Sequence, residues 1–121
     1  MLKLFALQVS VHDIEAAREF YVKGLGFDVV GDDLLPQAMY VKKDDLTIIL
    51  NKVEQPKVLT YPDQSQMIIN LVTTDLEATL ADFKEKNLNL LHDTAQECPV
   101  AHYIAVADPS GNVIEVIQMK G

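Results

Sequence analysis

Two stretches of the chain resemble each other, and this internal duplication limits the possible folds more than any other feature. The segment LQVSVHDIEAAREFY, which begins at Leu7, aligns without a gap with INLVTTDLEATLADF, which begins at Ile69. The offset is 62 positions, about half of the 121 residues, and Asp13 then meets Asp75. Because a repeated sequence pattern is the signature of a repeated structural unit, the chain is predicted to contain two copies of one module.

Each copy begins with apolar residues at alternating positions, which is typical of a half-buried strand. These residues are Phe5, Leu7, Val9 and Val11 in the first copy, and Met67, Ile69 and Leu71 in the second. Asp13 and Asp75 come next, where a helix needs a side-chain oxygen to accept its first backbone N–H groups. Each copy is therefore predicted to run from a strand into a capped helix.

The residues after each aspartate have the spacing of an amphipathic helix. The first apolar face consists of Ile14, Ala17, Phe20, Tyr21 and Leu25, and the second of Leu76, Leu80 and Phe83. Gly26 is predicted to end the first helix, because glycine readily adopts the left-handed conformation of a helix cap. The second helix is predicted to end near Asn87.

Three shorter extended runs follow each helix. They cover 27–30, 38–42 and 46–51 in the first copy, and 88–91, 103–107 and 112–118 in the second. The sequence DPSG at 108–111 predicts a type I turn and hence a hairpin between the last two runs. Each half therefore reads β-α-β-β-β, which predicts an α+β fold. We expect one domain, with a first module at about 1–52, a linker at 53–66 and a second module at about 67–121.

Charge and composition exclude several classes of partner. Eighteen acidic residues against ten basic ones give a net charge of −8, which disfavours nucleic acid and anionic membranes. No apolar run approaches the roughly 20 residues that span a bilayer, and the N-terminal residues contain no signal-like region. Cys98 is the single cysteine, so no intrachain disulfide can form, and we interpret it as a loop thiol. A cytoplasmic protein is expected.

The predicted strands have one face under the helices and one open face. If Leu7 and Ile69 pack under the helices, then the polar side chains of the open face are Gln8, Ser10 and Asn70. A shift of one residue would instead bury Gln8 and Asn70 without partners, which costs free energy. These polar residues are therefore candidate ligand contacts.

Glu115 lies between two apolar residues of the last predicted strand. A bare carboxylate in the core is implausible, so we expect it on the open face. A hairpin centred on the DPSG turn would pair Ala105 with Glu115 and Tyr103 with Ile117, which puts Tyr103 on the same face as Glu115. Glu115 is interpreted either as a pocket base or hydrogen-bond acceptor, or as a solvated or ion-paired carboxylate. Tyr103 is either a ligand contact or a packing residue.

The duplicated pattern, with VSVHDIEAAREFYVKGLGF, TTDLEATLADFKEK and ADPSGNVIEVIQ, resembles the vicinal oxygen chelate superfamily. That superfamily includes glyoxalase I, extradiol dioxygenases, fosfomycin-resistance enzymes and bleomycin-resistance proteins. The resemblance covers essentially the whole chain. It implies a U-shaped, cup-like mixed sheet with helices on the outside, and a homodimer in which a second chain often completes the pocket.

Metal-dependent members of that superfamily place their ligands on the first and last strands of each module. The resemblance carries these four positions onto Ala6, Ile49, Ile68 and Glu115. Only Glu115 has a donor atom, whereas a catalytic divalent cation ordinarily needs three or more protein ligands. The histidines lack the spacing of a metal site and are interpreted as surface or loop residues: His12, His92 and His102. No metal or other cofactor is expected.

Three functions remain open at this point. The first is metal-independent binding of a small organic molecule in the cup, with candidate contacts Gln8, Ser10, Asn70, Tyr103 and Glu115. The second is a metal-dependent lyase or dioxygenase, similar to lactoylglutathione lyase, that uses Glu115 as its catalytic base. The third is a ligand-free structural or regulatory dimer, because Ile49, Ile68 and Val72 could fill the cup. The incomplete ligand set favours the first.

Overall fold

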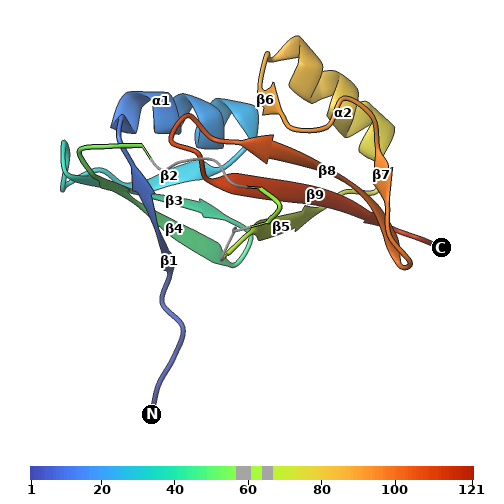
Figure 1. Cartoon of the computed structure of the whole chain (residues 1–121). Coiled ribbons are helices and arrows are strands. Elements are labelled where there is room, and N and C mark those ends of the chain that lie inside the picture. Colours follow the sequence, from blue (N-terminus) through green and yellow to red (C-terminus); the bar gives the residue numbers. More distant parts are fainter. Residues whose placement is uncertain (57–60, 64–66) are drawn as a thin grey trace. The chain divides into compact units, whose positions relative to one another are not determined.

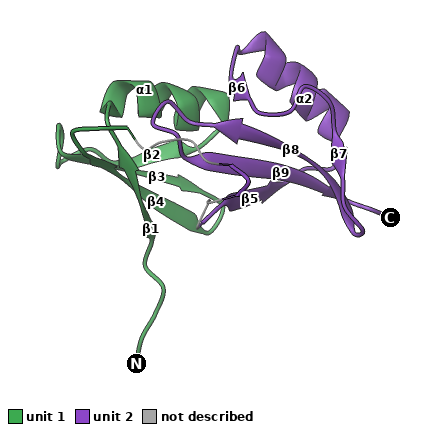
Figure 2. Cartoon of the chain, viewed as in Figure 1, with its two compact units in different colours: residues 1–57 green, residues 58–121 purple. Residues whose placement is uncertain are grey.

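A computed structural model of the chain describes residues 1–56, 61–63 and 67–121. The chain divides into two compact units, residues 1–57 and 58–121 (Figure 2). The predicted linker at 53–66 spans this division, and its residues 57–60 and 64–66 lie outside the described residues. Each unit contains one copy of the duplicated sequence, and each is described by itself below.

The first unit contains a four-stranded sheet and one helical segment (Figure 1). The order of the strands in the sheet is β1-β4-β3-β2, with β1 parallel to β4 and the other pairs antiparallel. Its elements are β1 (Leu7–Val11), α1 (Ile14–Arg18), η1 (Glu19–Gly24), β2 (Asp28–Gly31), β3 (Ala38–Lys43) and β4 (Leu46–Lys52).

The second unit repeats this topology in a five-stranded sheet with the order β5-β9-β8-β6, and β7 also pairs with β8. Its elements are β5 (Ile69–Val72), α2 (Leu76–Glu85), β6 (Asn89–Leu90), β7 (Gln96–Glu97), β8 (Ala101–Ala107) and β9 (Val113–Met119). Strand β5 is parallel to β9, as β1 is to β4. The predicted β-α-β-β-β order and α+β class are confirmed, and the six later strands agree with the prediction to within about two residues.

Strand β7 was not predicted. It lies in the polar stretch before β8 and pairs only two residues, Gln96 with Tyr103 and Glu97 with His102. Cys98 follows it in the turn to β8, where its N–H donates to the Ala101 carbonyl at 2.9 Å. The thiol is therefore in a loop, as expected, and is half-buried.

Both predicted helix caps are confirmed. Asp13 Oδ1 accepts the N–H of Ala16 at 3.1 Å, and Asp75 Oδ1 accepts the N–H of Ala78 at 3.0 Å. Gly26 adopts a φ of 81° after the first helical segment, which is the left-handed conformation expected there.

The first helical segment differs from the single helix that was predicted. After α1 the chain continues as a π-helix, in which the Leu25 N–H donates to the carbonyl of Phe20, five residues earlier, at 3.0 Å. Both Phe20 and Tyr21 are buried within this wider turn, and Tyr21 contacts Phe27 edge-on at a centroid distance of 5.8 Å. The aromatic residues at the end of the segment therefore belong to the core of the first unit.

Each sheet has a buried face and a more exposed face, as the alternation predicts. Gln8 and Ser10 are exposed in β1, whereas Leu7, Val9 and Val11 are half-buried or buried. Asn70 and Val72 are likewise exposed in β5. In the second unit α2 packs against β8 and β9, and its predicted apolar residues are buried: Leu76, Leu80 and Phe83.

Two strands were predicted to begin two residues too early. Phe5 and Met67 were placed on strand faces, but β1 begins at Leu7 and β5 at Ile69. The parallel pairing with β4 and β9 starts only at those residues, so Phe5 and Met67 lie outside the sheets and are 73% and 70% exposed. None of the helices in the described ranges is long and apolar enough to cross a membrane.

Candidate functional site

The hairpin of β8 and β9 determines where Glu115 lies. Its turn is held by the buried Asp108, whose Oδ1 accepts the N–H groups of Ser110 and Asn112, each at 2.8 Å. The resulting register pairs Ala105 with Glu115 and Tyr103 with Ile117. The predicted pairing is therefore confirmed, and Tyr103 and Glu115 share one face of the sheet.

On the other side of β9, strand β5 brings Asn70 beside Glu115 in the parallel register. Asn70, Glu115 and Ala105 thus form one row across three strands. Asn70 and Glu115 flank each other, while Ala105 opposite them has only a methyl side chain and is fully buried.

Gln8 and Ser10 lie in the first unit, in the corresponding strand β1. Gln8 pairs with Ile49, so Ile49 occupies in the first sheet the position that Glu115 occupies in the second. Ser10 pairs with Asn51. As ligand contacts, both residues remain predictions.

The Glu115 carboxylate is bound by a tyrosine that the sequence analysis did not consider. The Tyr61 hydroxyl donates to Glu115 Oε2 at 2.8 Å. Burial of the phenol, followed by this hydrogen bond, raises the pKa of Tyr61 above its ordinary value. Tyr61 therefore stays protonated near neutral pH and remains a donor to the carboxylate.

His92 lies at the free edge of β8, between the short strands β6 and β7. The Leu91 N–H donates to the Ala105 carbonyl at 2.8 Å, and the Ala105 N–H donates to His92 Nδ1 at 3.2 Å. Because Nδ1 accepts this bond, the proton of the neutral ring is on Nε2. A side chain thus replaces the strand partner that β8 lacks at Ala105.

The His92 ring also contacts two tyrosines. Its centroid lies 5.7 Å from that of Tyr61 and 5.7 Å from that of Tyr103, with interplanar angles of 71° and 78°. These edge-on contacts join residues from a turn, a loop and a strand. We call Tyr61, His92, Tyr103 and Glu115 the Glu115 cluster; all four are half-buried and belong to the second unit.

The Glu115 cluster suits an organic ligand better than a metal ion. It offers one carboxylate and three aromatic rings, which together can accept an N–H or O–H group and contact a flat or cationic group. The resemblance to the vicinal oxygen chelate superfamily implies Ala6, Ile49 and Ile68 as the other three metal-ligand positions, and their hydrocarbon side chains do not fit a metal ion. Among the described residues, no three His, Cys, Asp or Glu side chains gather in a way that could hold one.

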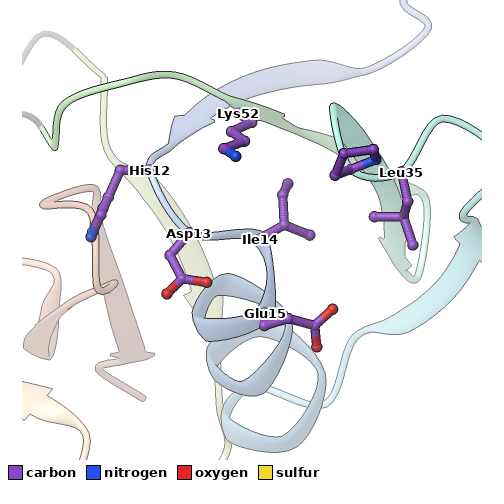
Figure 3. A pocket seen from close by; sticks show the side chains of 7 residues that line it. His12, Asp13, Ile14, Glu15, Leu35 and Lys52 are labelled. Atoms are coloured by element: carbon purple, nitrogen blue, oxygen red, sulfur yellow. The ribbon is translucent and has the colours of Figure 1, made fainter.

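A separate cavity of about 390 Å³ lies in the first unit (Figure 3). It is formed by the turn from β1 to α1, the loop between β2 and β3, and the end of β4, and its lining consists of His12, Asp13, Ile14, Glu15, Leu35, Pro36 and Lys52. Apolar, acidic and basic side chains are mixed around it. None of the candidate residues predicted from the sequence lines this cavity.

Sequence reasoning missed Tyr61 and His92. Tyr61 belongs to the stretch interpreted as a linker, and a single tyrosine beside a proline carries no signal of its contact with Glu115. His92 was interpreted as a loop residue, which is correct, but only the gap between β6 and β7 gives its ring a hydrogen bond to β8.

The chain is similar to one protein family over nearly all its length. The family model described as Glyoxalase/Bleomycin resistance protein/Dioxygenase superfamily matches residues 3–116. Among curated proteins, none is significantly similar to the chain.

Solved structures of the same fold cover almost the whole chain. The antibiotic binding protein TnmS3 from Streptomyces sp. CB03234 is 25% identical, with 99% of each chain covered and a TM-score of 0.71. A lactoylglutathione lyase from Agrobacterium tumefaciens is 19% identical, with 96% of this chain and 92% of that chain covered and a TM-score of 0.74. A glyoxalase/bleomycin resistance protein/dioxygenase from Alicyclobacillus acidocaldarius is 17% identical, covers 98% and 92%, and has a TM-score of 0.75.

Proposed function

The chain belongs to the Glyoxalase/Bleomycin resistance protein/Dioxygenase superfamily, and we propose that it binds a small organic molecule at the Glu115 cluster, without a metal ion or other cofactor. The observation that carries this proposal is the hydrogen bond of 2.8 Å from Tyr61 to Glu115. Of the four metal-ligand positions that the resemblance implies, only Glu115 keeps a donor, and its carboxylate is hydrogen-bonded to a phenol within a group of aromatic rings. Such a carboxylate is arranged to accept hydrogen bonds from an organic ligand.

Two further observations support this function. The antibiotic binding protein that resembles this chain at 25% identity has a function of the proposed kind. The net charge of −8 attracts cationic ligands and repels anionic ones at long range, and it disfavours nucleic acid as a partner. We therefore propose neutral or cationic ligands, contacted by Glu115, Tyr103 and Asn70 of the second unit.

A ligand screen tests this proposal. Neutral and cationic aromatic compounds are added to the full chain, and thermal unfolding followed by calorimetric titration identifies those that bind. We expect saturable binding that Glu115→Gln weakens about tenfold or more, because a hydrogen bond to a charged acceptor is lost. Glu85→Gln, at the exposed end of α2, is the matched charge control. If no compound of the panel binds, or if both variants bind as the wild type does, the proposal is wrong.

Metal content separates this function from the enzymatic alternative. The protein is purified without a chelator or a metal-affinity step, analysed for elements, and then heated with Ni²⁺, Zn²⁺, Mn²⁺ or Fe²⁺. We expect no stoichiometric metal and no saturable stabilisation. Near-stoichiometric metal that is lost in Glu115→Gln would instead favour a metal-dependent lyase or dioxygenase.

We also propose that the protein is a homodimer. Four of the six residues before β1 are large, apolar and strongly exposed: Met1, Leu2, Leu4 and Phe5. Exposed apolar side chains in one segment favour burial against a partner surface. Light scattering after size-exclusion chromatography should give twice the chain mass of 13.5 kDa, and replacing Leu4 and Phe5 by serine should lower it. A mass of one chain at micromolar concentration would contradict the dimer.

The cytoplasm is the proposed compartment. The single cysteine, Cys98, forms no disulfide within the chain and suits a reducing environment. Fractionation of cells that produce the protein should recover it with cytoplasmic markers.

A further inference from the structure

We propose that Tyr61 is a specificity-determining residue, which restricts Glu115 to ligands that present one donor nitrogen, such as an organic ammonium, and disfavours planar bidentate cations, such as an amidinium. This inference rests on the proposed function, because it concerns which ligands Glu115 accepts.

The two carboxylate oxygens of Glu115 are not equivalent. Oε2 accepts the Tyr61 hydroxyl at 2.8 Å, whereas Oε1 has no hydrogen-bond partner among the described residues. A planar amidinium or guanidinium binds a carboxylate through two parallel N–H···O bonds and needs both oxygens. An ammonium acts as a compact point charge and can use Oε1 alone. Each carboxylate oxygen can accept two hydrogen bonds, and Tyr61 already uses one of the two on Oε2. A planar cation therefore has to share Oε2 with Tyr61 or displace it, whereas an ammonium does not.

Tyr61 is held in place by more than this hydrogen bond. Its ring packs edge-on against His92, and His92 is itself fixed by the Ala105 N–H at 3.2 Å. Displacing Tyr61 breaks both the bond to a charged acceptor and the ring contact. A hydrogen bond to a charged group changes an equilibrium constant by about tenfold or more, and a planar cation that displaces Tyr61 loses that factor.

The neighbours of Glu115 can complete a site for an ammonium. Asn70 lies beside Glu115 in the register of β5 and β9, and its Nδ2 donates to the Ile68 carbonyl at 3.3 Å. This bond turns the amide so that Asn70 Oδ1 remains an acceptor, with no partner among the described side chains and backbone. An ammonium has three N–H groups, so it can donate to Glu115 Oε1 and Asn70 Oδ1 together. The ring of Tyr103 on the same face adds an aromatic surface for a cation.

Two small cations with the same ring test the inference. Benzylammonium presents one ammonium group, and benzamidinium presents a planar pair of N–H donors. Both are titrated into the wild type, Tyr61→Phe and Tyr40→Phe by calorimetry or NMR at neutral pH. Tyr40, which has a ring contact with Phe5 in the first unit, provides the matched control.

We expect the wild type to bind benzylammonium more tightly than benzamidinium. Tyr61→Phe should raise the affinity for benzamidinium about tenfold, leave that for benzylammonium within about twofold, and so reverse or abolish the preference. Tyr40→Phe should change neither. An unchanged ratio of the two affinities in Tyr61→Phe would overturn the inference, because Tyr61 would then not affect which cation binds. A loss of binding of both ligands would also overturn it, because Tyr61 would then contribute to binding in general and not to specificity.

A second measurement keeps the inference testable if Tyr61→Phe does not fold. In the wild type, the ring resonances of Tyr61 should move strongly with saturating benzamidinium, which displaces the hydroxyl, and little with benzylammonium. Equal movement with both cations would contradict the inference. If neither cation binds while neutral compounds of the broader screen do, the inference fails and the proposed function stands; if nothing binds at all, both fail.

Discussion

The Ala105 N–H donates to His92 Nδ1 at 3.2 Å, so a histidine side chain closes a gap in the hydrogen-bond ladder at the edge of β8. The gap exists because β6 pairs only with Val106 and Ala107, and β7 only with His102 and Tyr103. The same ring contacts Tyr61 and Tyr103. One side chain therefore connects the edge of the sheet to the residues around Glu115.

Replacing His92 should destabilise the second unit through this backbone group. His92→Phe keeps an aromatic ring but removes the acceptor, which leaves the N–H of the fully buried Ala105 unpaired and costs about 1–3 kcal/mol. His92→Asn can offer Oδ1 in a similar place and should recover part of the loss. Urea unfolding gives the free energies of unfolding. The control is His102→Phe, because His102 is exposed on β8, the strand that contains Ala105. Equal stability of His92→Phe and the wild type would contradict the role of this bond.

The tautomer of His92 can be observed directly. Because Nδ1 accepts the Ala105 N–H, the neutral ring should carry its proton on Nε2. Long-range proton–nitrogen NMR spectra at neutral pH distinguish the two tautomers. A proton found on Nδ1 would mean that the ring is turned and that Ala105 has another partner.

Because of Tyr61, the free energy of unfolding should fall as pH rises into the alkaline range. Its pKa in the folded chain is raised above the unfolded value of about 10, first by burial and then by the bond to Glu115. Above about pH 10 the unfolded chain loses this proton while the folded chain keeps it, so the stabilisation present below pH 10 is lost as pH rises towards the folded pKa. Urea midpoints measured between about pH 8 and 11 should fall more steeply for the wild type than for Tyr61→Phe. Parallel curves for the two proteins would count against the contact.

Asp108 should be the most sensitive residue of the closing hairpin. Its carboxylate accepts two backbone N–H groups and the side-chain amide of Asn112, which donates to Oδ2 at 2.9 Å. Asp108→Ala should lower the free energy of unfolding by about 2–3 kcal/mol. Asp108→Asn keeps one acceptor oxygen and should cost less. Thermal unfolding measures both, and an alanine variant no weaker than the asparagine variant would contradict this account.

The duplication predicts that the two helix caps contribute similar free energies. Asp13→Ala and Asp75→Ala each remove one bond to a first-turn N–H, at 3.1 Å and 3.0 Å, and each should cost about 1 kcal/mol. Asp33→Ala, an exposed loop substitution, is the control. Urea unfolding should separate both cap variants from the control; a cap variant as stable as Asp33→Ala would show that its bond contributes little.

Local chemistry explains why much of the fold is readable from the sequence. The register of the last hairpin follows from the DPSG turn and the glycine that ends it. Gly111 adopts a φ of 88° after the turn, the Asp108 N–H donates to the Asn112 carbonyl, and Ala105 opposite Glu115 is the result. The caps follow from an aspartate at the point where the period of apolar residues changes from strand to helix. The exposed face of Gln8 and Asn70 follows from the two-residue period of a strand.

The sequence by itself therefore determined the two-module architecture, the face of each strand and the position of Glu115 opposite Ala105, since each follows from a repeated or local pattern of residues. The parallel pairing of β5 with β9 in the tertiary structure placed Asn70 beside Glu115. Only the tertiary structure decided that Tyr61, 54 positions away, donates to Glu115, and that His92 completes the edge of β8. The physical reason is that a lone tyrosine or histidine has no periodic pattern, and its partner is chosen by which polar group the folded chain leaves unpaired nearby. The short strand β7 was also decided by the tertiary structure, because its two residues pair only with the edge of β8.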